Sequence, residues 1–331
     1  MTEIQSDLDA FESLAKTKTA FFKEIGKIII GQQEILDHLL IAILARGHSL
    51  LVGVPGLAKT LIIKSLSNVL DLSFNRIQFP PDLMPSDITG TELIDVEVAT
   101  GIKSFRFYQG PIFSNIVLAD EINRTPPKTQ AALLEAMQEH KVTTGGKTYN
   151  LDEPFFVLAT QNPIEQEGTY PLPEAQLDRF MFNLKIEYPS NKEEISIVRG
   201  TTTSEEPTLN KIISKSDILS FQKLVKRVPV SDNIVEYAVK LVSATRPNTD
   251  TAPDFINKSV EWGAGPRACQ YLILGAKAKA ILDGRPSPNI EDIQFLALPV
   301  LRHRVLPNFN AEAEGLKVDD IIYQLIEYLK D

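Results

Sequence analysis

The sequence of 331 residues has little cysteine and little histidine. Its one cysteine, Cys269, excludes an internal disulfide. The histidines do not have the spacing of metal ligands, since they are scattered over His38, His48, His140 and His303. No apolar run approaches the roughly 20 residues that a membrane span needs. Residues 1–18 are polar and acidic, unlike a signal peptide. These absences predict a cytoplasmic protein with no membrane span.

The chain also lacks an excess of basic residues. Lysine and arginine total 34 against 43 acids, which gives a net charge of −9. Such a surface is unfavourable for wrapping nucleic acid, so we expect no nucleic acid partner. The hydrophobic fraction of 43% is enough for a sizeable core and excludes a disordered chain. At roughly 150 residues per domain, the length predicts about two domains.

Short apolar segments alternate with helical periods over the first 200 residues. The apolar segments predict strands at 48–52, 73–78, 116–119 and 155–159. Helical periods predict helices over 25–45, which would end at Gly47, and over 61–70 and 127–139. The stretch 80–90 is expected to be a proline-rich loop. This alternation is typical of an α/β fold in which a parallel sheet lies between helices.

Two hairpins and a change of character complete the layout. Residues 91–110 read as an insertion that forms a hairpin around Thr100 and Gly101. A second hairpin near 141–153 turns on Gly145 and Gly146. The polar stretch 201–215 reads as a linker. Beyond it helices are expected at 218–226, 233–244, 267–282, 290–300 and 319–329. The sequence thus predicts an α/β domain over 1–200 with an N-terminal helical segment, and a smaller all-α domain over 216–331.

A glycine-rich segment between a predicted strand and a predicted helix has the layout of a phosphate-binding loop. We expect it to bind nucleotide phosphates through Gly53, Val54, Pro55, Gly56, Leu57, Ala58, Lys59, Thr60 and Leu61. Lys59 would bridge the β- and γ-phosphates, and the Thr60 hydroxyl would bind Mg²⁺. Ala58 replaces the second glycine of the pattern, which is tolerable if this residue has helical dihedral angles, because only a positive φ demands glycine. The alternative is an ordinary glycine-rich turn.

A second Gly-Lys-Thr occurs at residues 146–148. The first glycine of the pattern would have to stand at position 141, which is Lys141. No helix is expected to follow, because residues 149–154 lead into a strand. We therefore interpret this copy as a hairpin turn in which Lys147 is solvated.

Polar side chains follow two of the predicted strands. Asp120 and Glu121 end the strand at 116–119, and Asn162 follows the strand at 155–159. The carboxyl ends of parallel strands meet at one edge of a sheet, where the phosphate loop also lies. Asp120 could hold Mg²⁺, Glu121 could orient and deprotonate water, and Asn162 could hydrogen-bond that water and the γ-phosphate. The alternatives are a solvated acidic turn and a turn asparagine before Pro163.

Two arginines stand at helix ends. Arg179 ends a short helix, where the alternative is a surface salt bridge with Asp178. Arg267 opens a helix in the second domain, and a helix N-terminus with an arginine attracts anions. Its alternative is a capping or surface arginine.

Together these motifs resemble the AAA+ ATPases, and more closely the MoxR family. The resemblance covers most of the chain and is strongest at residues 53–60, 85–90, 118–124, 130–138, 159–168 and 173–180. It implies a Walker A motif at Lys59 and Thr60, a Walker B motif at Asp120 and Glu121, and sensor 1 at Asn162. Arg179 matches the arginine finger and Arg267 matches sensor 2.

The resemblance implies further features. Alanine at position 58 resembles the family's own variant, and Ile29, Ile30 and Gly31 match the stretch that usually lines the adenine pocket. Arg124 would either act across a subunit boundary or pair with an acid of its own subunit. The resemblance also implies that the protein uses ATP and Mg²⁺ and forms a hexameric ring. It further implies a chaperone that acts on client proteins, which in this family often carry von Willebrand factor A domains.

Four other protein classes are alternatives to the MoxR family. A GTPase switch should carry an Asn/Thr-Lys-x-Asp motif, and the nearest match, 191–194, ends in Glu194. A ring helicase needs basic hairpins, but the insertion has three acids against Lys103 and Arg106. The ATPase subunit of a magnesium chelatase is distinguished from the MoxR family only by the overall likeness of this sequence to the MoxR family. A nucleotide-binding scaffold without activity is disfavoured because both acids and both arginines are present.

Overall fold

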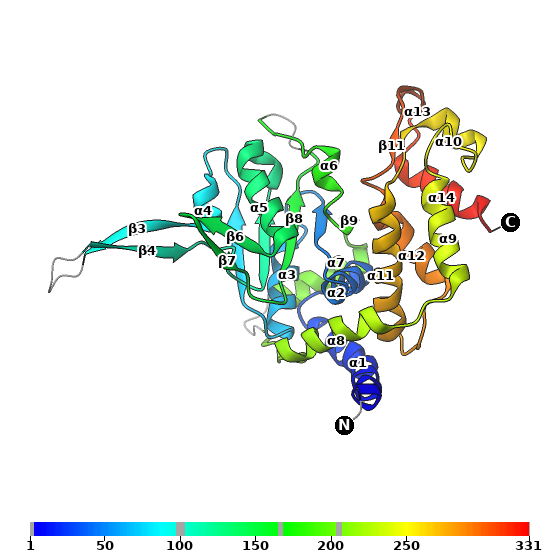
Figure 1. The fold of residues 1–331 in the computed structure, drawn as a ribbon. Helices are drawn as coiled ribbons and strands as arrows, with labels where there is room; N and C mark the ends of the chain where they lie inside the picture. The colour runs from blue at the N-terminus through cyan, green and yellow to red at the C-terminus, as the bar shows by residue number, and fades with distance from the viewer. Residues whose placement is uncertain (1–2, 97–102, 165–167, 203–206, 331) are drawn as a thin grey trace.

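The computed structural model describes residues 3–96, 103–164, 168–202 and 207–330. An α/β part and a helical part lie side by side, with α1 beneath them (Figure 1). The helices are α1 (Glu3–Ile25), α2 (Gln33–Leu44), α3 (Lys59–Val69), α4 (Pro85–Thr89), the 3₁₀ helix η1 (Ile122–Arg124), α5 (Pro127–Glu139), α6 (Glu174–Leu177), α7 (Asn191–Thr201), α8 (Lys215–Arg227), α9 (Asp232–Ser243), α10 (Asp254–Ser259), α11 (Pro266–Leu282), α12 (Ile290–Leu301), α13 (Phe309–Ala313) and α14 (Val318–Tyr328). The strands are β1 (Ser49–Val52), β2 (Phe74–Gln78), β3 (Gly90–Val96), β4 (Lys103–Gln109), β5 (Ile116–Asp120), β6 (Lys141–Thr144), β7 (Lys147–Asn150), β8 (Phe156–Gln161), β9 (Phe182–Lys185), β10 (Val260–Trp262) and β11 (Leu306–Pro307).

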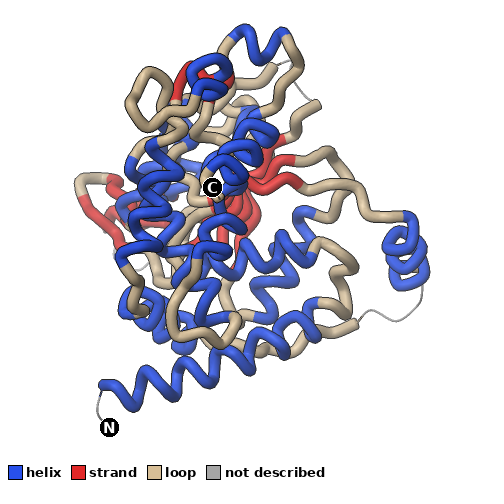
Figure 2. The backbone as a smooth tube through the Cα atoms, turned by 90° about the vertical axis from the view of Figure 1, so that its right-hand side faces the viewer, coloured by secondary structure: helices blue, strands red, loops and turns tan. Residues whose placement is uncertain are grey.

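The main sheet has the strand order β2-β5-β8-β1-β9, and its paired strands are all parallel. Alternate side chains of a strand point to opposite faces of a sheet. Accordingly, Leu118 and Leu158 lie in a core with α1, α2, α3 and the helical part, whereas Val117 and Val157 lie in a second core with α5. Helices enclose the strands in Figure 2. The expected parallel sheet between helices, followed by a helical part, is confirmed.

The register aligns the carboxyl ends of the strands. Val52 of β1 is paired with Gln161 of β8, and Gln78 of β2 is paired with Asp120 of β5. β8 lies between β1 and β5. The segments that follow these strands therefore leave the sheet at one edge and from neighbouring positions.

Two local expectations are wrong. The single helix over 25–45 is two helices, because α1 ends at Ile25 and α2 begins at Gln33. Between them Gly31 and Gln32 have φ angles of 72° and 57°, which a helix cannot continue. The loop at 80–90 contains the short helix α4, which begins at Pro85.

Both expected hairpins are present. β3 pairs with β4, and this hairpin extends away from the body of the molecule (Figure 1). Its expected turn at Thr100 and Gly101 lies outside the described residues. β6 pairs with β7, and Gly145 and Gly146 at its turn have positive φ angles of 55° and 75°. The Gly-Lys-Thr at 146–148 therefore lies in a hairpin, as expected.

The helical part packs on the first helices of the chain. α8 contacts α1 and α2, and α11 contacts the same two helices. Residues 207–214, in the stretch expected to be a linker, are anchored: Ile213 is buried, and the Asn210 backbone N–H donates to the Glu24 carboxylate at 2.7 Å. The other part of that stretch, 203–206, lies outside the described residues. A two-stranded ribbon of β10 and β11 was not expected from the sequence.

Within these described ranges, none of the helices has the length and apolar character of a membrane span.

Candidate active site

Residues 53–58 connect β1 to α3 and form the expected loop. Ala58 has φ 55° and ψ 22°, so the condition of helical dihedral angles, under which alanine would be tolerated here, is not met. A left-handed conformation costs an alanine about 1–2 kcal/mol, and glycine much less. The chain turns sharply into the helix at this residue, which is the physical reason why the pattern usually has glycine there.

The Lys59 side chain lies against the loop itself. Its ammonium donates to the carbonyl oxygens of Gly53 at 2.5 Å and Val54 at 3.3 Å. At Gly53 an added Cβ would stand 2.1 Å from the Ile186 side chain, so close packing on the end of β9 requires glycine. At Gly56, whose φ is 85°, an added Cβ would meet nothing within 4 Å. The rim of the loop is therefore open, while its base is tightly packed.

Asp120 and Glu121 lie at the end of the neighbouring strand β5. Asp120 is 7% exposed, and its carboxylate accepts from the Thr160 hydroxyl at 2.6 Å and from the Arg76 guanidinium at 2.6 Å. The Glu121 backbone N–H donates to Thr160 Oγ1 at 2.9 Å. Thr160 thus fixes both acids relative to β8.

The Glu121 side chain is held by two neighbours. Its Oε2 atom accepts from Gln78 Nε2 at 2.7 Å and pairs with Arg124 Nη1 at 3.1 Å. Of the two roles considered for Arg124, the structure contains the pair with an acid of its own chain. Glu121 itself has a positive φ of 58°, so the extended backbone of β5 ends at this residue.

Asn162 follows β8 directly and is 4% exposed. Its Oδ1 atom accepts from the Ile164 backbone N–H at 3.2 Å, so the turn role considered for this residue is present. Because β8 lies between β1 and β5, Asn162 stands at the sheet edge between the phosphate loop and the acidic pair.

Of the two arginines predicted from the sequence, Arg267 binds a carboxylate and, among the described residues, Arg179 does not. Asp178 pairs with Arg267 at 2.8 Å and with Arg304 at 2.7 Å. The salt bridge between Asp178 and Arg179 that the sequence allowed is not formed. The Arg179 guanidinium makes no hydrogen bond or ion pair with any other residue that the structure describes.

The segment expected at the adenine packs on the start of α7. Ile29 is buried, and an added Cβ on Gly31 would stand 2.4 Å from the Glu193 carboxylate. Hydrogen bonds from Ser190, which caps α7, lower the pKa of Glu193 and keep it ionised. The Gln32 side-chain amide donates to the Glu187 carbonyl oxygen at 3.0 Å. These contacts bring residues 29–32 beside the segment that follows β9.

Sequence reasoning missed four polar residues of this region, Arg76, Gln78, Thr160 and Arg304, and it considered Asp178 only as a salt-bridge partner of Arg179. Gln78 ends β2 in the same way that Asp120 ends β5, so a search for polar residues at all strand ends could have found it. The pairs of Asp178 join residues 89 and 126 positions apart, and no local pattern signals them.

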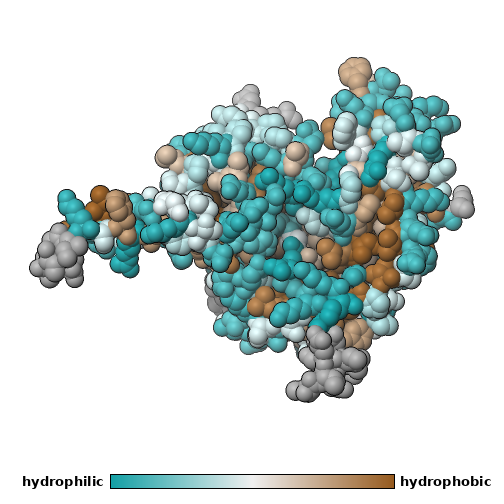
Figure 3. Space-filling view, in the orientation of Figure 1, coloured by the Kyte–Doolittle hydropathy of each residue, from teal (hydrophilic) through white to brown (hydrophobic). Residues whose placement is uncertain are grey.

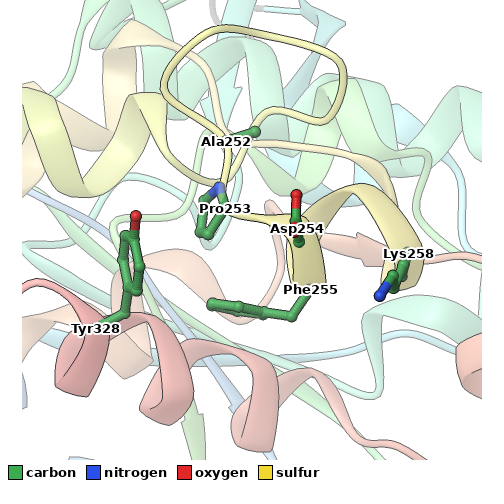
Figure 4. A pocket seen from close by; sticks show the side chains of 6 residues that line it. All are labelled: Ala252, Pro253, Asp254, Phe255, Lys258 and Tyr328. Atoms are coloured by element: carbon green, nitrogen blue, oxygen red, sulfur yellow. The ribbon is translucent and has the colours of Figure 1, made fainter.

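The donor set fits a magnesium ion that is held together with phosphate groups. Over the ranges described, no cluster of three or more His, Cys, Asp or Glu side chains could bind a metal unaided. Thr60 and Asp120 supply two oxygens, and Mg²⁺ is usually bound by one or two carboxylates together with substrate phosphates. A separate cavity of about 540 Å³ involves only the helical part, and it is lined by Ala252, Pro253, Asp254, Phe255, Lys258 and Tyr328 (Figure 4).

Comparisons with known proteins agree with this geometry. A model of the ATPase family associated with various cellular activities (AAA) matches residues 48–182, and an AAA lid domain model matches residues 255–325. The uncharacterised protein YeaC of Bacillus subtilis is 43% identical over 93% of this chain and 92% of its own length. Chaperone MoxR1 of Mycobacterium tuberculosis is 40% identical over 92% of this chain and 79% of its own length.

A solved structure shows the same fold over nearly the whole chain. The crystal structure of a candidate ATPase from Cytophaga hutchinsonii superposes with a TM-score of 0.91. It is 42% identical, and the match covers 99% of this chain and 98% of that one. The α/β part and the helical part are thus arranged as in that protein.

Proposed function

The chain belongs to the MoxR family of AAA+ ATPases, and we propose that it hydrolyses Mg-ATP to remodel or activate partner proteins. The observation that carries this proposal is the meeting of four groups at one sheet edge. The phosphate loop and Asn162 follow β1 and β8, and the acidic pair and Gln78 lie at the ends of the neighbouring strands β5 and β2.

Each group at the edge has a role in the proposed reaction. The loop N–H groups and Lys59 would bind the phosphates, and Thr60 and Asp120 would hold Mg²⁺. The bound ion would neutralise negative charge on the phosphate oxygens. Glu121 would orient the attacking water and accept its proton, and Asn162 would hydrogen-bond the same water. Residues 29–31 would contact the adenine.

The two arginines would act from different subunits. Arg267 would contact the γ-phosphate of its own subunit, and its position at the start of α11 supports attraction of an anion. Arg179 would reach the γ-phosphate of a neighbour. The lack of a described partner for its guanidinium supports this role. An arginine supplied in trans is worth roughly 10³–10⁵ in rate in well-studied enzymes.

Exposed apolar surface supports assembly and partner binding. The projecting hairpin exposes Ile94 and Phe105, which are directly paired across β3 and β4 and are 58% and 71% exposed (Figure 3). α7 contains no buried residue, and Ile195 and Val198 are exposed on it. Two relatives are named as a chaperone and as protein MoxR. We propose a homo-oligomeric ring, a hexamer by family resemblance, with protein clients that include von Willebrand factor A domain proteins.

A pair of lysine variants tests where ATP binds. Lys59→Ala removes the charge between the β- and γ-phosphates, so affinity for a fluorescent ATP analogue should fall at least tenfold. Lys147→Ala changes the lysine of the other Gly-Lys-Thr, which is in the β6–β7 hairpin, and should leave affinity unchanged. If Lys147→Ala is the variant that loses binding, the site is assigned to the wrong loop.

A mixing experiment tests whether the site is shared. ATPase activity per subunit should rise with protein concentration as rings assemble. Arg179→Ala should bind ATP yet hydrolyse it poorly, and adding Lys59→Ala subunits should restore activity, because these subunits supply intact arginines. Activity that is independent of concentration, with no recovery on mixing, contradicts a shared site.

A further inference from the structure

Side chains of the helical part bind the carbonyl oxygens of the turn that carries Arg179. This turn, residues 178–181, connects α6 to β9. Arg304 donates to the carbonyl oxygens of Asp178 at 2.8 Å, Phe180 at 2.6 Å and Met181 at 3.3 Å. The Tyr271 hydroxyl donates to the carbonyl oxygen of Arg179 itself at 3.1 Å. Four consecutive carbonyl groups are therefore held from outside the sheet.

Arg304 is built into the protein as a fixed group. It is 5% exposed, lies in the turn between α12 and β11, and its Nε atom donates to the Asp178 carboxylate at 2.7 Å. Its guanidinium lies over the Tyr271 ring, 5.2 Å from the ring centroid. The planar, multidentate guanidinium matches several acceptors at once, which a lysine cannot do. The neighbouring His303 also bonds the Phe180 carbonyl oxygen, at 3.0 Å.

The same carboxylate connects both arginines assigned to ATP. One Asp178 oxygen binds Arg304 and the other binds Arg267 at 2.8 Å. Arg267 is assigned to the phosphates of its own subunit, whereas Asp178 directly precedes Arg179. Asp178 of the turn therefore binds two arginines of the helical part, Arg304 and Arg267. Arg267 is the one that we propose to contact the bound nucleotide.

We propose that Arg304, assisted by Tyr271, is the positioning residue that aims Arg179 at the γ-phosphate bound by the neighbouring subunit. This inference rests on the shared site proposed above. Arg304 and Tyr271 both belong to the helical part, so a shift of that part in one subunit displaces the arginine offered to the next. The turnover of one site thus depends on the conformation of the adjacent subunit.

The test uses full-length variants Arg304→Gln and Tyr271→Phe, with Arg285→Gln as the matched control. Arg285 is another arginine of the helical part; it is half-buried and binds the Asp292 carboxylate through two hydrogen bonds of 2.7 and 2.6 Å. For each variant, kcat, KM, ATP affinity and thermal stability are measured alone and after mixing with Lys59→Ala. Arg179→Ala is carried through the same series.

We expect kcat to fall roughly 10–100-fold in Arg304→Gln and about threefold to tenfold in Tyr271→Phe, on the scale of lost hydrogen bonds. ATP affinity should be unchanged in both. Mixing with Lys59→Ala should restore activity, because the defect lies in the arginine that each variant offers to others. Arg285→Gln should lose stability yet keep its kcat. If Arg304→Gln does not fold, the Tyr271→Phe results decide alone.

The shared site and the positioning role of Arg304 are contradicted by different results. If Arg179→Ala is rescued by Lys59→Ala but Arg304→Gln and Tyr271→Phe are not, or if both keep the wild-type kcat, the positioning role is overturned and the shared site stands. If Arg179→Ala is not rescued, the shared site fails and the positioning role fails with it.

Discussion

Ala58 is the residue of the phosphate loop with the most unusual conformation, since its φ of 55° favours glycine. Ala58→Gly should therefore relieve the backbone strain, but it also increases the backbone entropy of the unfolded chain. The net effect should be a free energy of unfolding raised by about 0.5 kcal/mol. ATP affinity should be unchanged. Denaturant unfolding of the variant measures the effect.

Ala45 provides the matched control for this prediction. It is buried but has an ordinary φ of −82°, so Ala45→Gly should lower the free energy of unfolding by about 1 kcal/mol. Equal losses in the two glycine variants would contradict the strain at position 58.

Three buried histidines, His38, His48 and His303, have lowered pKa values and make the stability depend on pH. Burial lowers the pKa of His38 and of His48 to about 4. His48 Nδ1 accepts from the Val157 N–H at 3.0 Å, so a proton there would face another donor. The side chains of His38 and His48 are neutral when folded but bind protons near pH 6.5 when unfolded. Lowering the pH from 7.5 to 5 should therefore reduce the free energy of unfolding by about 2 kcal/mol for each of these two histidines.

The variant His48→Gln isolates one of these contributions. A glutamine offers a carbonyl oxygen to Val157 and an amide to the Met137 carbonyl oxygen, which His48 binds at 3.1 Å, and it does not titrate. Denaturant unfolding between pH 7.5 and 5 should show a smaller pH slope for this variant. An unchanged slope would mean that His48 is not the titrating group.

The sequence indicates single residues only where they belong to a local motif. Lys59, Thr60, Asp120, Glu121 and Asn162 were identified because a short pattern or a strand end marks each one. Arg304 was not, because its significance depends on Asp178, which is 126 residues away. The conformation of Ala58 could not be predicted, since the sequence does not give the angle at which the loop enters α3.

At the scale of elements, the β3–β4 hairpin packs against the β6–β7 hairpin at its base, whereas side chains nearer its end are exposed. Phe107 stacks on Tyr149 of the second hairpin at 4.2 Å between ring centroids. Phe105, two residues away on the same face, is 71% exposed. A two-stranded hairpin is marginally stable by itself in water, so the stacking at its base contributes to its position.

Serine variants of these two residues should behave differently. Phe107→Ser removes the stacking and should lower the free energy of unfolding by about 1–2 kcal/mol. Phe105→Ser should change it by less than about 0.5 kcal/mol but should reduce the binding of a hydrophobic dye, because it removes exposed apolar surface. Thermal unfolding and dye fluorescence check both outcomes. A larger stability loss in Phe105→Ser would show that the end of the hairpin is packed.

Most elements follow from local periodicity, and the failures have a physical cause. The apolar run at 116–119 and the helical period at 127–139 predicted β5 and α5 closely. The break between α1 and α2 was missed because the apolar residues of 25–45 continue across it. Gly31 adopts its left-handed conformation beside the Glu193 side chain, a contact from 162 residues further along the chain that no periodicity reveals.

At the scale of the whole molecule, the larger core extends from the sheet into the helical part. Leu158 of β8, Leu36 of α2 and Leu272 of α11 belong to one buried cluster. The composition near residue 201 marks a change of secondary structure, but it gives no information on this packing. A continuous core provides a physical connection between the proposed nucleotide site and the helical part.

The central claim is that Glu121 acts as the base for ATP hydrolysis at this sheet edge. Glu121→Gln keeps the size of the side chain and its hydrogen bonding but cannot accept a proton. The most direct measurement compares equilibrium ATP binding with steady-state hydrolysis in the wild type and in this variant, with Mg²⁺ present. We expect affinity within about twofold of the wild type and turnover reduced roughly 10²-fold or more. Unchanged turnover in Glu121→Gln would contradict the claim.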